Sequence, residues 1–330
     1  MKKMYKDMMA VEATLPETEI VIARKIKSKH NQFYLYYNRI NQELHFGIEL
    51  EGSRPSSSKL PNSKGFQTKW STLPFTSSSK PALILSCVGV QNVDFFLRVT
   101  EDLKNCLQHI KDEERMATNA ISRIIMWQDF FKKHGENQFA PEKQKGLYGE
   151  LRTIELVSND LSLEEVIKGW MGPRKTSQDF HLDLCHMETK VTSRKDPATI
   201  RIHGFEQLTP PVGKELYLHT LSVKTSETSG ETVMDIEGHI SAKLLMSPEV
   251  LEQFHSKLLS YGYPVGGFNN PMHFEIEEEK FYKVQEGFPR IERRPGIYNI
   301  EYDILLADIE PFKIDYSTVR KSLGVLHKAI

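Results

Sequence analysis

Residues 179–191 read DFHLDLCHMETKV, a stretch in which apolar and polar residues alternate in two successive runs. Such a double run predicts a short β-hairpin that turns near Leu182 and Asp183. Side chains along a strand point alternately to the two faces of a sheet, so Glu188 and Lys190 share one face, which we expect to be open. Asp179, at the start of the first strand, then lies opposite Glu188. The hairpin is therefore predicted to bring two carboxylates and one lysine together.

This trio has a recognisable chemistry. Carboxylate oxygens are hard ligands that suit Mg²⁺ or Mn²⁺. A cation held by Asp179 and Glu188 would polarise a phosphodiester and lower the pKa of water, while Lys190 would orient that water or stabilise the developing charge. The trio points to metal-assisted hydrolysis of a phosphodiester.

An acid two residues before a lysine is also common on solvated strand faces. Asp102 with Lys104 and Glu278 with Lys280 have the same spacing. Asp102 lies in a helical pattern and Glu278 in a run of acidic residues, so neither pair has the alternating apolar context of the hairpin. That context favours the pair at 188 and 190.

A second informative stretch, GLYGELRTIEL at residues 146–156, predicts a helix with Leu147, Leu151 and Ile154 in one apolar stripe. Glu150 lies about 60° from Leu147 on the helical wheel, at the edge of this stripe. A carboxylate there could reach a metal site on an adjacent sheet. It could equally be a first-turn glutamate favoured by the helix dipole, and the spacing leaves both interpretations open.

Composition limits the class of protein. A chain of 330 residues with 43 Lys and Arg against 44 Asp and Glu can bury a full core but has no global basic field, so any DNA site must be a local patch. Cys87, Cys106 and Cys185 form neither a zinc pattern nor a disulfide framework. With no signal peptide and no membrane-spanning segment in the sequence, we expect a soluble protein of the cytoplasm.

The chain divides by pattern into three parts. Residues 1–100 are β-rich, with strands expected within 20–50, 82–90 and 94–99, and this part could recognise DNA or bind a partner. Within it, residues 52–80 predict an irregular loop that either follows a DNA backbone or is simply solvated. Residues 101–260 contain helical segments and the hairpin. Residues 261–330 form a strand and helix extension.

Two helix starts are marked by local chemistry. Ser162 with Glu165 predicts a capping box for a short helix that ends near Trp170. Ser247 with Pro248 predicts the start of another helix, because proline suits a helix's first position.

Six basic residues are candidates for contacts with a phosphate backbone, because they follow the hairpin or cluster beside Pro295. They are Arg194, Lys195, Arg201, Arg290, Arg293 and Arg294. Solvated surface charges are the alternative for all of them.

Taken together, these residues resemble the PD-(D/E)XK, restriction-endonuclease-like nuclease superfamily, and more narrowly the bacterial "PD-(D/E)XK motif protein" family of restriction and phage-defence loci. The resemblance covers residues 127–208. It is carried by Trp127 before Phe130 and Phe131, the helix GLYGEL, the segment WMGP, Asp179-Phe180, METK followed by Thr192, and RIHGFEQL at 201–208. Gln178 stands where the superfamily's name has proline.

The resemblance implies a mixed central sheet flanked by helices, an α/β (α+β) restriction-endonuclease-like core. It places Glu150 on the first core helix, Asp179 on the second core strand and Glu188 with Lys190 on the third, with Gln207 facing the site. The three carboxylates would bind the metal.

It also implies a function. The expected activity is Mg²⁺- or Mn²⁺-dependent cleavage of double-stranded DNA by a subunit of a restriction or phage-defence system, alone or as a homodimer. Other restriction subunits and a cognate DNA methyltransferase would be the partners. The alternative is a subunit of the same fold that binds DNA or partner proteins without cutting.

Overall fold

The computed structural model describes residues 1–28, 30–50, 60, 65–77, 79–134, 139–174, 177–268 and 270–323. The chain forms two compact units. Unit 1 comprises Met1–Asn137 with Pro264–Gly266, and unit 2 comprises Gln138–Tyr263 with Gly267–Ile330. Both are mixtures of helices and sheets, and the described residues form no barrel, in agreement with the expected α/β class.

Unit 1 is built on an antiparallel sheet whose five described strands follow the order β1-β2-β3-β5-β4. Apolar side chains on one face of the central strands, such as Phe46, Ile48 and Leu85, are fully buried. Its elements are α1 Lys2–Glu12, β1 Val21–Ile26, β2 Gln32–Asn38, β3 Glu43–Glu49, β4 Phe66–Ser71, β5 Ala82–Cys87, η1 Val90–Asn92, α2 Val93–Leu107 and α3 Glu113–His134.

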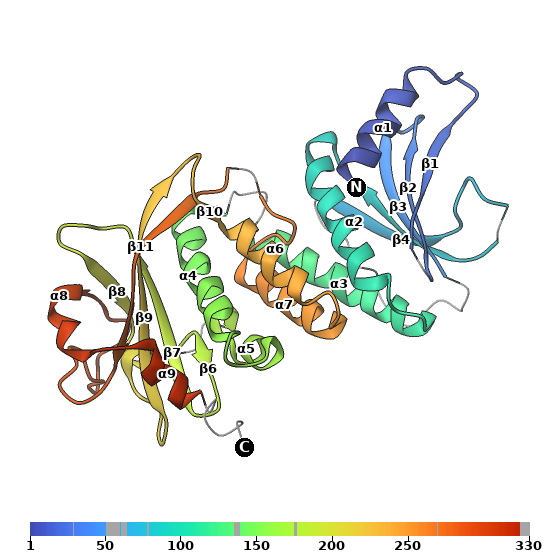
Figure 1. The fold of residues 1–330 in the computed structure, drawn as a ribbon. Helices are drawn as coiled ribbons and strands as arrows, with labels where there is room; N and C mark the ends of the chain where they lie inside the picture. The colour runs from blue at the N-terminus through green and yellow to red at the C-terminus, as the bar shows by residue number, and fades with distance from the viewer. Residues whose placement is uncertain are drawn as a thin grey trace. The chain divides into compact units, whose positions relative to one another are not determined.

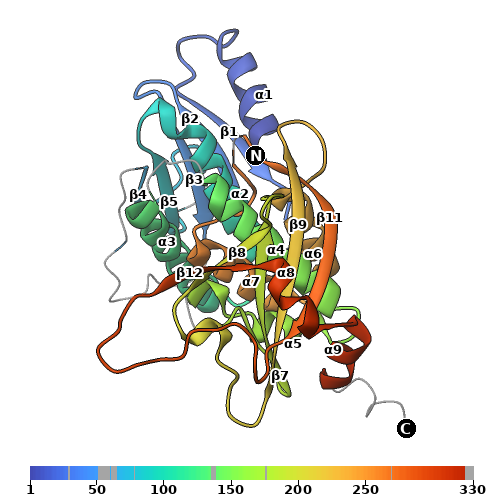
Figure 2. The same cartoon turned by 90° about the vertical axis from the view of Figure 1, so that its left-hand side faces the viewer.

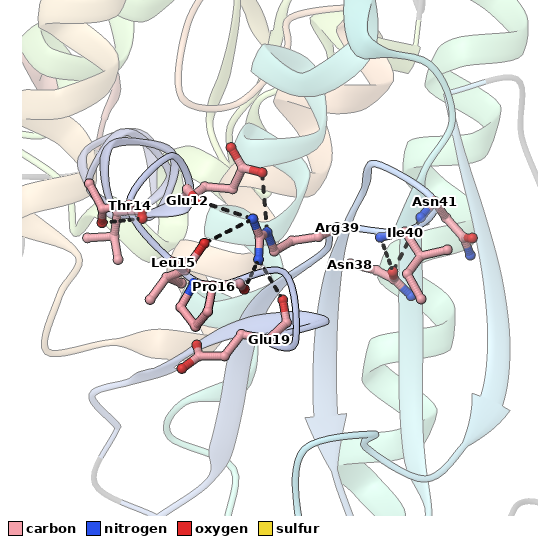
Figure 3. A network of polar contacts seen from close by, with 10 residues as sticks. Glu12, Thr14, Leu15, Pro16, Glu19, Asn38, Arg39, Ile40 and Asn41 are labelled. Carbon is pink, nitrogen blue, oxygen red and sulfur yellow. Dashed lines mark hydrogen bonds and ion pairs between the residues drawn. The ribbon is translucent and has the colours of Figure 1, made fainter.

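Arg39 ties together the turns at one end of this sheet (Figure 3). Its guanidinium pairs with Glu12 at the end of α1 and donates hydrogen bonds to the carbonyl oxygens of Pro16 at 2.7 Å and Glu19 at 2.8 Å. A guanidinium suits this task because it presents several donors in a fixed plane. One side chain thus fixes the path from α1 into the first strand.

Two expectations for unit 1 are wrong. Residues 94–99 are helical and not a strand, because Phe96, Val99 and Leu103 form one buried stripe of α2. Residues 66–71 of the expected irregular loop form β4, which pairs with β5 along its whole length. Residues 52–59, 61–64 and 78 of that expectation lie outside the described part of the chain, and its remaining described residues belong to no helix or strand.

The division into units also differs from the expected boundaries at residues 100 and 260. Helix α3 belongs to unit 1, where its Phe131 contacts Phe66 of β4 at a ring-centroid distance of 6.1 Å. Beyond residue 260, strand β11 (His273–Lys283) pairs with β9 (Glu215–Ser226) inside the sheet of unit 2. The C-terminal segment is therefore a component of the main sheet and not an extension to it.

Unit 2 is organised around that sheet, which has the strand order β10-β11-β9-β7-β6 with β13 paired to β11. Strands β7 and β9 are parallel, and the other pairings are antiparallel. The further elements are α4 Pro141–Val157, α5 Leu163–Gly169, η2 Gly172–Arg174, β6 Phe180–His181, β7 Cys185–Thr192, β8 Thr199–His203, η3 Glu206–Leu208, β10 Glu231–Thr232, α6 Val233–Lys243, α7 Pro248–Tyr261, β12 Glu301–Leu305, α8 Leu306–Ile309, η4 Glu310–Phe312, β13 Lys313–Ile314 and α9 Tyr316–Ser322.

Helix α4 covers one face of this sheet, and the β8–β12 ribbon and α8 lie on the other side (Figure 1). The contact with α4 is close. A Cβ atom built on Gly149 would lie 2.3 Å from a methyl group of Val191 on β7, so only glycine allows the helix to approach this far. On the opposite face, Leu216 and Leu218 of β9 pack in one cluster with Ile200 and Ile202 of β8. Figure 2 shows the long strands β9 and β11 side by side.

The local predictions for helix starts are confirmed. The capping box of α5 is complete, since Glu165 N–H donates to Ser162 Oγ and Ser162 N–H donates to the Glu165 carboxylate. Pro248 occupies the first turn of α7. The three cysteines are free, as expected. Among the helices in the described ranges, none has the length and apolar character needed to cross a bilayer.

Candidate active site

The predicted hairpin is present as β6 and β7. Phe180 pairs with Met187, and Leu182 N–H closes the turn by donating to the carbonyl oxygen of Cys185 at 3.0 Å. This register places Asp179 beside the middle of β7, where its Oδ2 accepts a hydrogen bond of 2.9 Å from the peptide N–H of Thr189. The carboxylate that precedes the hairpin is thus fixed between Glu188 and Lys190.

Lys190 is held by two partners on the same face of β7. Its Nζ lies 2.8 Å from Glu188 Oε1 and donates to Gln207 Oε1 at 3.0 Å. Gln207 is oriented in turn by the peptide N–H of His203, which donates to the same oxygen at 2.8 Å. The expectation that Gln207 faces the site thus agrees with the geometry, and its contact is with the lysine.

The face that carries Glu188 and Lys190 is not open, contrary to the expectation from alternation. The Lys190 side chain is 14 % exposed and that of Glu188 only 1 %. Gln207 and its short helix η3 cover the lysine from this side. Both carboxylate oxygens of Glu188 are buried without a hydrogen bond of good geometry, so the ion pair with Lys190 is their main polar contact.

Glu150 of α4 is also buried, at 6 % exposure, and both of its oxygens are occupied. Trp170 Nε1–H donates to Oε2 at 2.6 Å, and the Tyr261 hydroxyl donates to Oε1 at 3.0 Å. Gly172 leaves the space that this carboxylate fills, because a Cβ there would lie 1.9 Å from Glu150 Oε2. The helix dipole therefore does not explain this residue, which is a fixed part of the site's wall.

The charges of the site act on one another. Burial, together with the Asp179 carboxylate, raises the pKa of Glu188 to about 8. Burial and Asp179 also raise the pKa of Glu150, and burial raises that of Asp179 against the opposing effect of Lys190. Burial disfavours the ammonium of Lys190, but Glu188 and Asp179 outweigh it and raise its pKa. The carboxyl groups of the site therefore hold their protons more tightly than free carboxyl groups, and the ammonium of Lys190 is stabilised in its charged form.

The donor set fits a hard divalent cation. Such a cation would supply the charge that Asp179 and Glu188 need to ionise and would add a partner for the buried oxygens of Glu188, whose main polar contact is Lys190. No three His, Cys, Asp or Glu side chains in the described ranges are grouped as a ready-made cage for a metal. Asp179 and Glu188 are consequently the best-placed ligands, since the oxygens of Glu150 already accept hydrogen bonds.

The other acid and lysine pairs have different settings. Glu278 and Lys280 form an ion pair of 3.0 Å on β11, with Glu278 57 % exposed. Asp102 instead accepts hydrogen bonds from Arg123 and Trp127 in the core of unit 1. Lys280 also lies 3.6 Å from Glu310, which is 47 % exposed, so of the three pairs only Glu188 and Lys190 are buried beside further carboxylates.

The candidate phosphate-binding residues are largely engaged with acids. Arg194 and Arg201 pair with Asp303, Lys195 with Glu277, Arg290 with Glu292 and Arg293 with Glu206. In the part of the chain that the structure describes, Arg294 is exposed and makes no ion pair. These pairs reduce the positive potential available to a phosphate backbone.

Sequence reasoning missed Tyr261 and the role of Gly172. Tyr261 ends α7, far along the chain from Glu150, and no motif marks it. Trp170 and Gly172 belong to the WMGP segment that contributed to the resemblance, so the sequence marked their position but did not indicate what they do.

Comparison with known proteins agrees with this geometry. A family model described as "Putative PD-(D/E)XK family member, (DUF4420)" matches residues 1–307. No curated protein and no solved structure gives a significant match to the chain.

Proposed function

The chain belongs to this PD-(D/E)XK family, and from that premise we propose that it is a Mg²⁺- or Mn²⁺-dependent endonuclease that hydrolyses the phosphodiesters of double-stranded DNA. The observation that carries the proposal is the arrangement around Lys190. Its ammonium lies 2.8 Å from Glu188 and 3.0 Å from Gln207, beside Asp179, on strand β7.

The roles of the residues follow from their contacts. Asp179 and Glu188 would hold the cation, which supplies Lewis-acid stabilisation of charge on the phosphodiester. Lys190 orients the attacking water or stabilises charge on the phosphoryl group, and Gln207 keeps its ammonium in place. Trp170 and Tyr261 hold Glu150 at the wall of the site.

A cleavage assay with a matched pair of lysine variants tests this assignment. Lys190→Ala should abolish Mg²⁺-dependent cutting of unmodified duplex DNA, because the transition state loses several kcal/mol of stabilisation. Lys280→Ala removes a surface lysine with the same spacing from an acid and should cut as the wild type does. DNA binding, measured by fluorescence anisotropy, should be the same for all three proteins. Cutting by Lys190→Ala at the wild-type rate would refute the proposal.

A second function has its own supporting observation. Glu188 is 1 % exposed and most candidate phosphate-binding residues are paired with acids, which favours a subunit that binds DNA or partners without cutting. Such a subunit would show no cleavage with Mg²⁺ or Mn²⁺ under any condition, and Lys190→Ala would leave its activity in the assembled system unchanged.

The biological setting is part of the proposal. We infer a cytoplasmic subunit of a bacterial restriction or phage-defence system that works with other subunits and with a cognate DNA methyltransferase, or as a homodimer. The lack of a large free basic surface on the candidate residues supports a need for partners. Efficient, methylation-sensitive cleavage at one defined sequence by the isolated chain would contradict this need.

A further inference from the structure

A chain of four polar side chains, of which all but Glu279 are buried, runs beneath the strand that carries Glu188 and Lys190. Glu279 Oε1 of β11 lies 3.0 Å from His219 Nε2 of β9, and His219 Nδ1 lies 2.8 Å from Thr153 Oγ1 of α4. Thr153 Oγ1 lies 2.9 Å from Thr189 Oγ1 of β7. His219 and Thr153 are completely buried, and Phe281 stacks on the imidazole at 4.4 Å. These four residues, the buried relay, connect a helix and three strands.

The hydrogen atoms of the relay can be placed from its partners. Burial lowers the pKa of His219, so its imidazole is neutral and carries one proton. The Glu279 carboxylate only accepts, so it selects the tautomer with the proton on Nε2. The single proton of the Thr153 hydroxyl is then shared between His219 Nδ1 and the carbonyl oxygen of Gly149, which lies 2.9 Å from Thr153 Oγ1, and the oxygen of Thr153 accepts from the hydroxyl of Thr189.

Thr189 is the junction between the relay and the candidate metal ligands. Its side chain belongs to the relay, while its peptide N–H donates to Asp179 Oδ2 at 2.9 Å. Its neighbours in the chain are Glu188 and Lys190, whose side chains point to the opposite face of β7. A displacement of Thr189 therefore shifts Asp179 and Glu188 relative to each other.

We propose that Thr153 and His219 are positioning residues that set the spacing of the Asp179 and Glu188 carboxylates through Thr189. This inference rests on the proposed metal-dependent function of that pair. An apolar core would join the same layers without the cost of burying the polar side chains of Thr153, Thr189 and His219. A polar network whose hydrogen bonds are satisfied instead fixes one position of the helix relative to the strands. Residues that hydrogen-bond to metal ligands commonly orient those ligands in this way.

The test compares two substitutions at Thr153 with a matched control. Thr153→Val keeps the shape of the side chain but removes the hydroxyl, and Thr153→Ser keeps the hydroxyl. Thr100→Val is the control, because Thr100 is equally buried and its hydroxyl also bonds a backbone carbonyl of its own helix, in unit 1. Mn²⁺ affinity by titration calorimetry is the primary readout, with the Mg²⁺ requirement of DNA cleavage as the second.

We expect Thr153→Val to weaken Mn²⁺ binding by about 10-fold, which is the lower end of the range of losses seen when residues that support metal ligands are substituted. Thr153→Ser should stay within about 2-fold of the wild type on the same scale. Thr100→Val should bind Mn²⁺ as the wild type does, and none of the variants should change DNA affinity measured without a divalent cation.

Unchanged Mn²⁺ affinity in Thr153→Val, or equal losses in the valine and serine variants, would overturn the inference. If Thr153→Val does not fold, His219→Asn and His219→Leu replace it. Asparagine retains an acceptor near the position of Nδ1, so the His219→Asn protein should bind Mn²⁺ more tightly than the His219→Leu protein. If the variants change Mn²⁺ affinity as expected but the wild type never cuts DNA, only the proposed endonuclease activity is refuted. If the wild type binds no Mn²⁺, the positioning role itself is refuted.

Discussion

Glu188 occupies an unfavourable place for a carboxylate. It is 1 % exposed, its oxygens receive no hydrogen bond of good geometry, and the Asp179 carboxylate adds to the effect of burial. A buried charge without full compensation shifts its pKa until it is neutral. Glu188 therefore holds its proton more tightly than a free glutamate, which links metal binding to proton release.

The free energy of unfolding should report this shift. The pKa of Glu188 is about 8 in the folded protein, above the 4.5 that is usual for a glutamate, so between these pH values the folded state holds a proton that the unfolded chain has released. Stability then falls with rising pH, by at most about 1.4 kcal/mol per unit. Glu188→Gln cannot ionise, so in EDTA it should lose less stability than the wild type between pH 5 and pH 8, as measured by urea unfolding.

The exposed Glu278 provides the control for that experiment. It pairs with Lys280 at the surface, so Glu278→Gln should follow the pH dependence of the wild type. Parallel curves for wild type and Glu188→Gln would show that Glu188 is ionised in the absence of metal.

The hairpin trio was predictable because its geometry is local. Strand alternation and one turn suffice to place Asp179 beside Glu188 and Lys190. Burial of the same residues was not predictable, since it depends on η3 and on the β8–β12 ribbon, which come from later parts of the chain. For the same reason no pattern near Glu150 could indicate its bond to Tyr261.

Among the elements, η2 is the one on which the position of Glu150 depends most directly. Gly172→Ala would place a Cβ 1.9 Å from Glu150 Oε2, so the carboxylate must move and its bond with Trp170 must lengthen or break. We expect a lower melting temperature and a higher Mg²⁺ concentration for half-maximal cleavage, which thermal unfolding and a metal titration measure.

Gly238 of α6 supplies the comparison. A Cβ there meets nothing within 4 Å, so Gly238→Ala should be neutral or stabilise the helix by about 0.5–1 kcal/mol. A Gly172→Ala variant with the melting temperature and metal requirement of Gly238→Ala would show that Glu150 is not confined as described.

In unit 1, α2 and α3 are joined by a buried ion pair. Asp102 accepts from Arg123 Nε at 2.7 Å and from Trp127 Nε1 at 2.6 Å, and both charged side chains are 2 % exposed. Asp102→Ala removes the carboxylate from beside the buried guanidinium of Arg123, and breaking a buried ion pair in this way typically costs about 3–5 kcal/mol. We expect chemical denaturation to show a loss of that size, with the Mn²⁺ affinity of the folded protein unchanged because no candidate ligand lies in unit 1.

Reduced Mn²⁺ affinity in folded Asp102→Ala would contradict the assignment of the site to unit 2 alone. Asp102→Asn is the milder partner variant, since it retains an acceptor for Trp127.

The helices and strands differ in how well their sequences identified them. Helix α4 and strand β7 follow clear periodicities and were predicted. The start of α2 was misassigned because DFFLRV is rich in aromatic and β-branched residues typical of strands, whereas its burial follows helical spacing that extends to Leu107. Tertiary packing decided between these two readings of the same residues.

At the scale of the whole molecule, the surface charges predict weak DNA binding. Five of the six candidate phosphate contacts are paired with acids, and the net charge is −1. Since each phosphate contact contributes about −0.9 to the slope of log K against log salt, we expect the isolated protein to give a slope no steeper than about −3. Fluorescence anisotropy with duplex DNA over a range of salt concentrations measures this slope.

Asp303→Asn is informative in the same assay, because Asp303 pairs with both Arg194 and Arg201. If these arginines lie on the protein surface that contacts DNA, the variant should bind DNA more tightly and with a steeper salt dependence. A steep slope in the wild type would mean that the ion pairs open on DNA or that other basic residues form the interface.

The order of strands in the sheet of unit 2 also has a consequence for synthesis of the protein. The parallel partners β7 and β9 leave the ribosome first, but β11, which covers the other edge of β9, follows only after residues 227–272. At roughly 5–20 residues per second, that edge remains unpaired for roughly 2–9 s. During this interval His219 lacks both Glu279 and Phe281, so the nascent chain carries the acids and the lysine of the site without the residues that order them. Its unpaired strand edge is then the part most exposed to aggregation and most in need of a chaperone.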